Sequence, residues 1–429
     1  MKGYEINVHH ITRIEGHGNL VVNVKDGHIE ELRLEIVESP RFFEAMLEGR
    51  RYDEAPWITA RICGICALGH TTASILAAED ALGIEPDEET VLLRKLLVDG
   101  ETLQSHILHL YFLVAPDFFN AGSVIPLAET HPEVVKRALR LKKMANASVE
   151  TLVGRKVHPI GMMPGGFRRW PLPEEIGEVK RLLLEAREDL TATVELFRRL
   201  DMPPLRRDET EYLALREDGE YALYTGQIAS SLGTISPPRT YRDRIHETVA
   251  PHSSAKHVSA ERDSFAVGAL ARYNLNHDRL RPWAKAVAAE LGLEPPVTNP
   301  FHNNTAQLVE ILHCYEDALE LCDQLLERPN GDHRIQEPTR HGRGVGASEV
   351  PRGTLYHDYR IDESGRITEA NCIIPTGQNL ANIEADMRQV VSDMAGGEPN
   401  DIQQRLEMLV RAYDPCISCS CHFLDVEFV

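Results

Sequence analysis

Alternating apolar and polar residues mark the start of the chain as β structure. The apolar positions that alternate with polar ones on the two sides of Asp26-Gly27 are Leu20, Val22, Val24, Leu32, Leu34 and Ile36. Such alternation has the period of a strand with one buried face, and an Asp-Gly pair is typical of a hairpin turn. The pattern therefore predicts an antiparallel hairpin over residues 20–36.

Further along, apolar residues recur with the 3.6-residue period of a helix. Between residues 90 and 113 the recurring positions are Leu92, Leu93, Leu96, Leu97, Leu103, Ile107 and Leu110. This period predicts a long helix in the core. Pro173 before two glutamates, and Asn400-Asp401, are typical of helix starts. Similar patterns predict further helices over about 131–154, 174–200, 280–292, 304–327 and 379–413.

Two stretches, residues 203–260 and 328–354, lack a clear period and contain Pro and Gly residues, so we expect irregular structure there. Gly342, Gly344 and Gly346 do not form the strand–glycine–helix pattern of a nucleotide-binding loop, and we interpret them as a flexible turn. Residues 354–375 again resemble a hairpin. The elements together predict an α+β fold, with a mainly helical core of long packed helices and a small antiparallel β portion.

The charge and the distribution of apolar residues indicate which partners and which cellular location to expect for the protein. The 429 residues include 46 Lys plus Arg and 66 Asp plus Glu, which gives a formal net charge of −20. An acidic chain without clustered Lys and Arg is a poor binder of phosphate backbones, so we expect no nucleic-acid partner. The sequence contains no run of about 18 apolar residues, so we expect no transmembrane segment. Its first residues also lack the apolar region of a signal peptide. We therefore expect a cytoplasmic protein.

Four of the eight cysteines form two C-x-x-C pairs at opposite ends of the chain, and Cys416 lies 350 positions after Cys66. Two such pairs supply four thiolates, which favour zinc, iron–sulfur, nickel or copper over magnesium or calcium. The spacing alone leaves three interpretations open: a structural zinc site, a redox or catalytic metal, and two unrelated thiol pairs. The apolar surroundings of Cys314, Cys322 and Cys372 predict small buried side chains.

The residues around the two pairs narrow these alternatives. The first pair lies in Arg61-Ile62-Cys63-Gly64-Ile65-Cys66, followed by His70, and the second lies in Asp414-Pro415-Cys416-Ile417-Ser418-Cys419, followed by His422. Arg-Ile-Glu-Gly-His occupies 13–17 and Glu-Val-Pro-Arg-Gly occupies 349–353. These spaced motifs, in this order, make the chain resemble the large subunit of a nickel–iron hydrogenase over essentially its whole length.

The resemblance implies a binuclear nickel–iron centre whose iron also carries carbon monoxide and cyanide. By position, Cys63 and Cys416 resemble the terminal nickel ligands, and Cys66 and Cys419 resemble the ligands that bridge nickel to iron. Heterolytic cleavage of H2 needs a Lewis acid for the hydride and a base for the proton. The resemblance implies that the Cys416 thiolate is this base, and that Glu15 is the first carboxylate of the proton relay. Outside its motif, Glu15 would be interpreted as a surface or helix-capping carboxylate.

The same resemblance implies a polar group above the metals. Arg352 corresponds to an arginine near the open metal position, held by Asp117 and Asp414, with Pro351 beside it. Asp117 also has the simpler interpretation of a residue at a helix end. Pro375 and Thr376 match positions that line the cyanide ligands, although a buried Thr making an ordinary backbone contact is an alternative for Thr376.

Glu44 and His422 resemble the residues of the family that bind a magnesium or iron ion near the C-terminus. His70 resembles a residue that hydrogen-bonds near a bridging sulfur rather than binding a metal. Cys421 is an additional thiol within the second motif, and we expect it to fill space. In the family a maturation peptidase removes the tail after the last His, so we expect residues 423–429 to be cleaved.

The resemblance also implies partners. No further cluster-type cysteine set remains, so electrons are expected to leave through an iron–sulfur small subunit, together with further electron-transfer subunits. The moderate length and the final His of the second motif favour a cytoplasmic group that couples H2 to NAD(P), a deazaflavin or a heterodisulfide-linked partner. The alternatives are a structural zinc protein and a non-catalytic scaffold subunit. We expect one domain over 1–429, with a β-rich part (1–50), a helical core (70–330) and a metal-binding C-terminal part (340–422).

Overall fold

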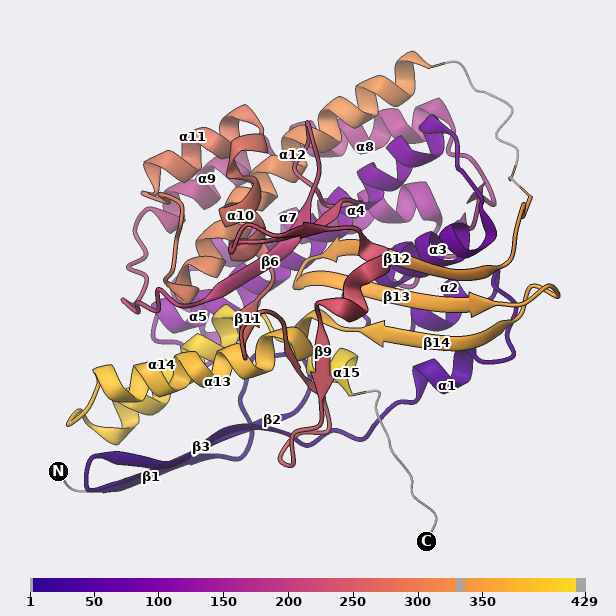
Figure 1. Cartoon of the computed structure of the whole chain (residues 1–429). Coiled ribbons are helices and arrows are strands. Elements are labelled where there is room, and N and C mark those ends of the chain that lie inside the picture. The colour runs from indigo at the N-terminus through magenta and orange to yellow at the C-terminus, as the bar shows by residue number, and fades with distance from the viewer. Residues whose placement is uncertain (1–2, 329–334, 336, 422–429) are drawn as a thin grey trace, which may run out of the picture.

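The computed structural model describes residues 3–328, 335 and 337–421. Long helices form one layer of the molecule, and three-stranded sheets lie beside and below it in the view of Figure 1. In the helical layer α4 packs against α7 and α12, and α12 packs against α8 and α11. These helices are α4 (Glu88–Leu108), α7 (Pro132–Val153), α8 (Pro173–Glu185), α9 (Arg187–Phe197), α10 (Ala269–Asn276), α11 (Pro282–Glu290) and α12 (Asn303–Glu327). The fold is α+β, as predicted.

The predicted helices are present, but three of them are interrupted. The helix expected over 90–113 is α4 followed by a π-helical turn, η1 (His109–Val114), and the short α5 (Ala115–Phe118). The helix expected over 174–200 is divided into α8 and α9, and α8 begins at Pro173 as predicted. The helix expected over 379–413 is divided into α13 (Pro375–Asp393) and α14 (Pro399–Ala412), because Gly396 adopts a φ of 89° between them.

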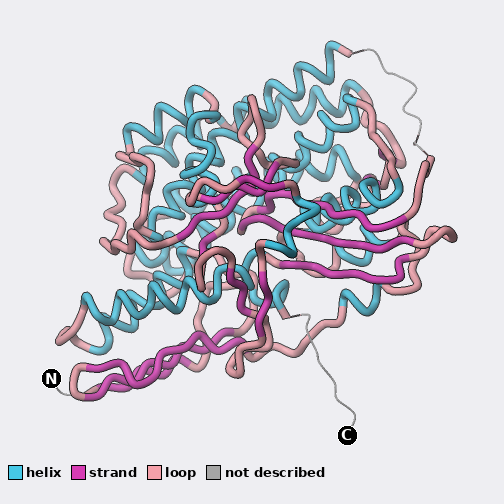
Figure 2. The backbone as a smooth tube through the Cα atoms, viewed as in Figure 1, coloured by secondary structure: helices cyan, strands magenta, loops and turns pink. Residues whose placement is uncertain are grey.

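The N-terminal hairpin belongs to an antiparallel sheet of three strands, β1 (Tyr4–Val8), β2 (Gly18–Lys25) and β3 (His28–Ile36). Asp26 and Gly27 both have positive φ, at 49° and 82°, as a two-residue hairpin turn requires. A second antiparallel sheet contains β12 (Gly342–Val350), β13 (Gly353–Ile361) and β14 (Ile367–Ile373). The hairpin expected over 354–375 is therefore the β13–β14 pair, which Figure 2 shows beside the third long strand.

Two stretches expected to be irregular contain strands. Residues 203–260 include β6 (Glu211–Arg216), β7 (Gln227–Ser230), β8 (Ile235–Ser236), β9 (His246–Thr248) and β10 (His257–Ser259). Strands β6, β7 and β8 form a sheet with β11 (Phe265–Ala266), whose pairing with β6 is parallel. Most of 328–354 was also expected to be irregular, yet β12 occupies 342–350 and is buried from Gly344 onward. Because both of its faces are covered, β12 lacks the alternation that reveals a half-exposed strand.

The glycines of β12 are packing residues and not a flexible turn. A Cβ atom on Gly344 would lie 2.1 Å from the backbone N of Ala81, and one on Gly346 would lie 2.1 Å from the backbone O of Ala73. Both alanines belong to α3 (Ala67–Leu82), which packs directly on β12. The missing side chains therefore allow helix and strand backbones to approach closely.

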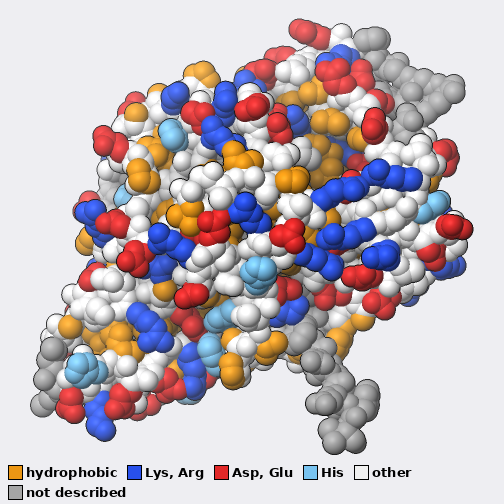
Figure 3. Space-filling view, viewed as in Figure 1, with side chains coloured by type: hydrophobic (Ala, Val, Ile, Leu, Met, Phe, Trp, Pro, Cys, Tyr) orange, Lys and Arg blue, Asp and Glu red, His pale blue; other side chains and the backbone are white. Residues whose placement is uncertain are grey.

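The remaining elements are short. They are α1 (Phe43–Leu47), α2 (Ala55–Thr59), α6 (Val124–Thr130), β4 (Met162–Met163), β5 (Gly166–Phe167), η2 (Pro238–Asp243), η3 (His277–Arg279), η4 (Pro300–His302) and α15 (Ile417–Ser420). Cys314, Cys322 and Cys372 are buried, as predicted. Within the part of the chain that the structure describes, no helix combines the length and the apolar character needed to cross a membrane. Figure 3 shows a surface on which acidic and basic side chains are intermixed.

Candidate metal centre

The first cysteine pair lies in the turn that leads into α3. Cys66 immediately precedes the helix, and Cys63 lies three residues earlier. The backbone N–H groups of Ile65 and Cys66 both donate to the Sγ of Cys63, at 3.2 Å each. Two converging donors stabilise a thiolate, so the turn itself prepares this sulfur to bind a metal.

The second pair lies after α14, where Asp414 turns the chain with a φ of 49° and α15 begins directly after Cys416. The N–H of Cys416 donates to the Oγ1 of Thr376 at 2.9 Å, which fixes this segment on the start of α13. Cys416 and Cys419 lie side by side, with their Cα atoms 5.6 Å apart. Metal ligation by both sulfurs requires their thiolate forms.

The two pairs meet in the interior. The Sγ atoms of Cys63 and Cys416 lie 3.4 Å apart, and one sulfur from each of Cys63, Cys416 and Cys419 lies within 4.8 Å of the others. Cys66 hydrogen-bonds to Cys63 and completes the set, and all four side chains are buried. Four soft sulfur donors at one enclosed point fit a nickel–iron pair or zinc, and do not fit magnesium or calcium.

The electrostatics of this site favour a thiolate at Cys63. The hydrogen bond from Cys66 lowers the pKa of the Cys63 thiol to about 7 against the opposing effect of burial, and the charge of Arg352 acts in the same direction. The same contact with Cys63, together with burial, raises the pKa of the Cys66 thiol. One sulfur of the first pair is therefore prepared to lose its proton before the other.

Arg352 lies over the sulfurs on the turn between β12 and β13. Its Nη1 donates to the Sγ of Cys66 at 3.0 Å, its Nε to the carbonyl O of Asp414 at 2.7 Å, and its Nη2 to the Oδ1 of Asp414 at 2.8 Å. Gln307 donates to the other carboxylate oxygen of Asp414 at 3.1 Å. Burial alone would lower the pKa of Arg352, but Asp414 and the sulfurs raise it. A charged guanidinium is thus held in one orientation beside the cysteines.

Asp117 does not hold Arg352, which corrects the expectation from the sequence. Its carboxylate accepts from Arg13 at 2.5 Å and from the Nε and Nη2 of Arg411 at 2.7 and 2.9 Å. The π-helical turn η1 and the proline-containing α5 place Asp117 on the side of Arg411. Asp117 therefore anchors the end of α14 through Arg411, which lies three residues before Asp414. It makes no hydrogen bond to the guanidinium of Arg352.

Glu15 reaches the second cysteine pair from the N-terminal segment. Its Oε2 accepts from the Sγ of Cys416 at 3.2 Å and from the N–H of Ser418 at 3.1 Å, and its carbonyl O accepts from the N–H of Ile417 at 3.0 Å. The following residue must be glycine, because Gly16 has a φ of 86° and a Cβ there would lie 2.6 Å from the Cβ of Ile417. Glu15 is only partly buried, so its carboxyl connects the interior with the solvent-facing side.

The predicted lining residues lie at element ends beside these groups. Pro375 and Thr376 are the first two residues of α13, and the Thr376 hydroxyl is the acceptor for Cys416 described above. The carbonyl O of Pro351, next to Arg352, accepts from Arg272 at 3.0 Å. The backbone contact of Thr376 is thus made with the metal-binding motif itself.

His70 and Glu44 contact different strands of the sheet formed by β12, β13 and β14. The Nδ1 of His70, in the first turn of α3, lies 3.2 Å from the Nε2 of His357 on β13. The Oε1 of Glu44, on α1, accepts from the N–H of Cys372 at 2.7 Å and from Asn371 at 3.1 Å. The second predicted ligand of the C-terminal ion, His422, and the tail 423–429 lie outside the described residues.

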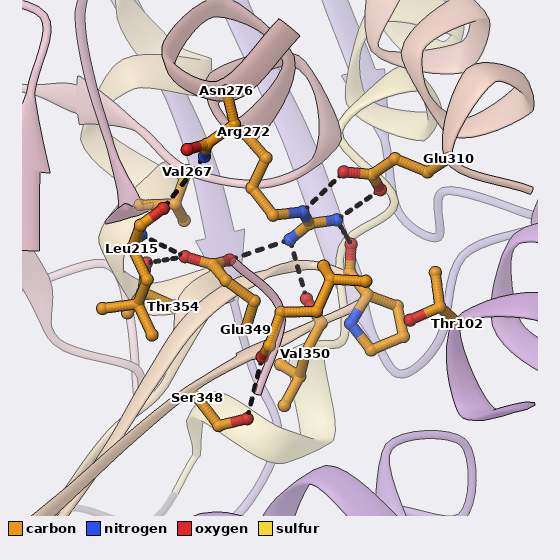
Figure 4. A network of polar contacts seen from close by, with 12 residues as sticks. Thr102, Leu215, Val267, Arg272, Asn276, Glu310, Ser348, Glu349, Val350 and Thr354 are labelled. Atoms are coloured by element: carbon orange, nitrogen blue, oxygen red, sulfur yellow. Dashed lines mark hydrogen bonds and ion pairs between the residues drawn. The ribbon is translucent and has the colours of Figure 1, made fainter. Parts of the chain in front are cut away.

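A buried ion network behind Arg352 was not predicted from the sequence. Figure 4 shows Arg272 between Glu310 and Glu349; its Nε and Nη2 donate to Glu310 at 2.6 Å each, and its Nη1 donates to Glu349 at 2.9 Å. The same guanidinium donates to the carbonyl oxygens of Val350 and Pro351, at 2.9 and 3.0 Å. Arg272 therefore fixes the turn that carries Arg352, and Glu349 of the predicted Glu-Val-Pro-Arg-Gly motif acts through it.

Glu101 on α4 is a second residue that sequence reasoning missed. Its two carboxylate oxygens accept from the N–H groups of Leu68 and Gly69, at 2.8 and 2.9 Å, at the start of α3. Burial raises the pKa of Glu101 to about 8, although these two N–H donors act in the opposite direction. The residue lies within a helix that the sequence marks only as apolar and periodic, so no local signal distinguishes it.

Comparison with known proteins identifies the group of proteins that share these features. The family model described as nickel-dependent hydrogenase matches residues 41–168 and 214–422. The alpha subunit of sulfhydrogenase 1 from Pyrococcus furiosus is 36% identical over 418 residues, with 97% of each chain covered. A subunit of the F420-non-reducing hydrogenase from Methanothermobacter marburgensis is 34% identical, with 97% of this chain and 94% of the relative covered.

Solved structures agree with these sequence relatives. An NAD+-reducing [NiFe]-hydrogenase in the H2-reduced state matches with a TM-score of 0.88 and 30% identity, over 98% of this chain and 99% of the other. A [NiFeSe]-hydrogenase from Dm. baculatum matches with a TM-score of 0.77 at 22% identity, over 98% of this chain and 100% of the other. At this identity, the match supports the fold alone.

Proposed function

The chain belongs to the nickel-dependent hydrogenase family, and from this premise we propose that it oxidises H2 reversibly to two protons and two electrons at a nickel–iron centre bound by Cys63, Cys66, Cys416 and Cys419. It is an oxidoreductase acting on H2, as the large, catalytic subunit of such an enzyme. The observation that carries the proposal is the meeting of two distant cysteine pairs beneath a charged arginine. Bound there, with carbon monoxide and cyanide on its iron, the centre would supply the Lewis acid that accepts the hydride of H2.

The chain's own residues handle the proton. The Cys416 thiolate takes it, and Glu15 receives it across the 3.2 Å contact with the sulfur. A partly buried carboxyl in hydrogen-bond contact with a thiol is suited to general acid–base transfer. The N–H of Ser418 holds the accepting oxygen in place, so Glu15 stays in line with the sulfur during transfer.

Arg352 and Asp414 act on the open side of the centre. A guanidinium fixed by two hydrogen bonds to Asp414 offers its remaining N–H groups and its positive charge at one position, without reorganisation during the reaction. Pro351, Pro375 and Thr376 line the same space, and Pro375 and Thr376 are assigned to the cyanide side. His70 supports the first cysteine pair through the start of α3.

Glu44 and His422 are proposed as ligands of a magnesium or iron ion near the C-terminus. Glu44 supports this assignment, because its carboxylate is already oriented by the N–H of Cys372. We also propose that a maturation peptidase cleaves after His422. Mass spectrometry of the C-terminus before and after nickel loading tests this step.

The electrons are proposed to leave through an iron–sulfur small subunit and further electron-transfer subunits. The complex is proposed to act in the cytoplasm, and the final acceptor is NAD(P), a deazaflavin or a heterodisulfide-linked partner. Support comes from relatives whose names carry subunit designations, including the beta subunit of the NAD-reducing hydrogenase HoxS of Cupriavidus necator, which is 30% identical. Purified complex supplied with H2 and each acceptor in turn identifies the acceptor as the one reduced fastest.

Elemental analysis and infrared spectroscopy of the complex, purified from a host able to mature it, test the central proposal. We expect one nickel and one iron at the four cysteines of each chain, bands of carbon monoxide and cyanide, and uptake of H2 with a reducible dye. Zinc alone, without these bands and without H2 uptake by a chain already cleaved after His422, would overturn the proposal in favour of a structural zinc protein. An assembled centre without H2 turnover would overturn it in favour of a scaffold subunit.

A further inference from the structure

Two histidines and a glutamate that take no part in the cysteine site meet beside α13. His252 precedes β10, His257 begins β10, and Glu384 lies on α13, nine residues after Pro375. One possible ligand atom from each of the three lies within 4.8 Å of the other two. Figure 3 shows histidine side chains on the face of the molecule that carries β9 and its neighbours. We call these three residues the His–His–Glu cluster.

The contacts within the cluster resemble those of an empty metal site. The Nε2 of His252 lies 2.8 Å from the Oε1 of Glu384, and the rings of His252 and His257 meet edge to face with centroids 5.5 Å apart. The N–H of Leu34 donates to the same glutamate oxygen at 2.9 Å and orients the carboxylate. The Nε2 of His257 is buried and has no hydrogen-bond partner among the described residues. His257 thus has a buried ring nitrogen without a hydrogen-bond partner in a group that also holds a histidine and a carboxylate, and such a nitrogen requires an explanation.

We propose that the His–His–Glu cluster binds one divalent transition-metal ion of the zinc class. Two imidazoles and one carboxylate form a ligand set typical of zinc, whereas calcium and magnesium prefer oxygen ligands alone. The ion replaces the proton shared between His252 and Glu384, and it satisfies the unpaired nitrogen of His257. Closing the ligands onto zinc at about 2.0–2.2 Å needs only small side-chain movements.

The surroundings leave the ion one open position. The side chains of His252 and Glu384 are 25% and 15% exposed, so water reaches the fourth coordination position. Glu35 on β3 lies close enough to His252 to interact with its charge, and adds negative potential on the same side.

The ion would link three elements that lie side by side. The ligands come from α13 and from the segment that enters β10, and the N–H that orients Glu384 comes from β3. These elements pack on one another, α13 against β10 and α13 against β3. Ser254, between the two histidines, bonds to Ile36 of β3 and to the sulfur of Cys421. The bound metal therefore stabilises the surface on which the C-terminal motif rests.

Zinc content of the purified, full-length chain tests this proposal. The chain is freed of metal with a chelator under reducing conditions, equilibrated with excess zinc and desalted. We expect each of His252→Gln, His257→Gln and Glu384→Gln to retain one zinc ion less per chain than the natural sequence, because the cysteine centre is unchanged in all of them. Removing a group that hydrogen-bonds to a metal ligand weakens metal binding about 10–100-fold. Removing a ligand itself should therefore weaken zinc binding by at least about 100-fold.

A matched control and a second readout separate binding from misfolding. His246→Gln changes an exposed histidine of the same β9–β10 hairpin and should keep the full zinc content. The difference in X-ray absorption between the natural chain and Glu384→Gln should contain a nitrogen and oxygen shell at about 2.0–2.2 Å and no sulfur shell. Zinc should raise Tm in the natural chain more than in Glu384→Gln, which keeps the acceptor for Leu34. Equal zinc content in the natural chain and all three variants overturns the proposal, and so does a sulfur shell in the difference spectrum.

Discussion

At the scale of single residues, the roles are decided by partners from distant parts of the chain. Glu15 contacts a sulfur 401 positions away and is held by the N–H of Ser418. Its carboxyl is partly buried, whereas Asp414 is buried and occupied by Arg352 and Gln307. Of these two acids beside the cysteines, only Glu15 combines contact with Cys416 and access toward solvent, which is what a proton relay requires.

Replacing Glu15 by glutamine should therefore stop proton transfer and leave the metal centre assembled. The amide oxygen still accepts from Ser418, but the side chain no longer carries a proton between Cys416 and the solvent side. We expect H2 turnover and exchange of H2 with D2O to fall by about 10²–10⁴-fold. Nickel content and infrared bands should be unchanged.

Glu15→Asp keeps an ionisable group with a shorter reach, and it should retain more exchange than Glu15→Gln. Glu31→Gln alters an exposed carboxylate on β3 of the N-terminal sheet and serves as the control. Full H2–D2O exchange in Glu15→Gln would show that the proton leaves by another route.

The residues that sequence reasoning found share one property. Cys63, Cys66, Cys416, Glu15 and Arg352 lie in short motifs whose order along the chain is itself a signal. Their convergence follows from recognising the motifs as parts of one site, because 350 positions of unrelated pattern separate the two cysteine pairs. Glu101 and Arg272 were missed because each is a single charged residue within a helix, and its role is defined by the groups it meets in three dimensions.

At the scale of elements, the close packing of α3 on β12 positions two parts of the centre at once. Cys66 immediately precedes α3, and Arg352 follows β12 by two residues. The glycines of β12 and Gly69 of α3 remove side chains along this contact; a Cβ on Gly69 would lie 2.2 Å from the Cγ1 of Val350. The distance between the guanidinium and the first cysteine pair is thus set by glycines.

Gly346→Ala should consequently destabilise the protein and reduce its activity. The new Cβ would lie 2.1 Å from the backbone O of Ala73 and 2.5 Å from the backbone N of Ala77, so helix and strand must separate. Overpacking of this kind costs about 1–3 kcal/mol of unfolding free energy. Thermal unfolding measures the loss, and H2 uptake per bound nickel measures the displacement of Arg352 from the centre.

The same substitution elsewhere provides a control of opposite sign. Gly177 lies within α8 and has no atom within 4 Å of the position of a Cβ. Gly177→Ala should stabilise the helix by about 0.4–1 kcal/mol. If Gly346→Ala unfolded at the same temperature as the natural protein, glycine would not be required for the contact between α3 and β12.

Elements were predicted well where one face is exposed and poorly where both are covered. The β2–β3 hairpin and the amphipathic α8 are evident from their periods, because polar residues alternate with the apolar core positions. In β12 glycine and serine take the buried places, so the strand resembles a loop in its sequence. The break between α8 and α9 leaves the apolar period intact and was therefore not visible, whereas Asn400-Asp401 indicated the start of α14.

At the scale of the whole molecule, buried titratable groups couple stability to pH. Burial lowers the pKa of His313 to about 4, below the ordinary 6.5, and its Nδ1 accepts from the N–H of Arg281 at 3.2 Å. The unfolded chain therefore binds a proton at this residue between pH 6.5 and about 4, while the folded chain does not. This contribution to stability is complete above pH 6.5 and is lost as the pH falls toward 4.

His313→Asn should reduce this acid sensitivity. The asparagine Oδ1 replaces Nδ1 as the acceptor for Arg281, and it does not titrate. Between pH 6.5 and 4 the unfolding free energy of the natural chain should fall more steeply than that of the variant, by up to about 1.4 kcal/mol per pH unit. Denaturant midpoints at several pH values measure the two slopes. Replacing the exposed His28 by asparagine should leave the slope unchanged; equal slopes in His313→Asn and the natural chain would exclude His313 as the source.

Closing the chain around the centre needs contacts between the two cysteine segments that do not depend on metal, and Arg41 provides them. Its Nη1 donates to the carbonyl O of Ile62 at 2.7 Å and to that of Ser418 at 3.3 Å, and its Nη2 donates to the carbonyl O of Arg61 at 2.9 Å. Its own N–H donates to the carbonyl O of Cys421 at 2.8 Å. One side chain thus joins residues next to Cys63 with residues next to Cys419.

Arg41→Ala should therefore loosen the second segment from the first. The substitution removes the side-chain donors and keeps the backbone hydrogen bond to Cys421. Buried hydrogen bonds to a charged group contribute about 1.5–3 kcal/mol to stability. We expect a smaller contribution here, because Arg41 is partly exposed. We expect a lower fraction of chains with bound nickel and faster amide exchange over residues 416–421. Arg51→Ala, at an exposed arginine whose side chain pairs with the nearby Asp53, is the control and should change neither measurement. Full nickel content with unchanged exchange in Arg41→Ala would mean that the thiolates and the metal alone close the chain.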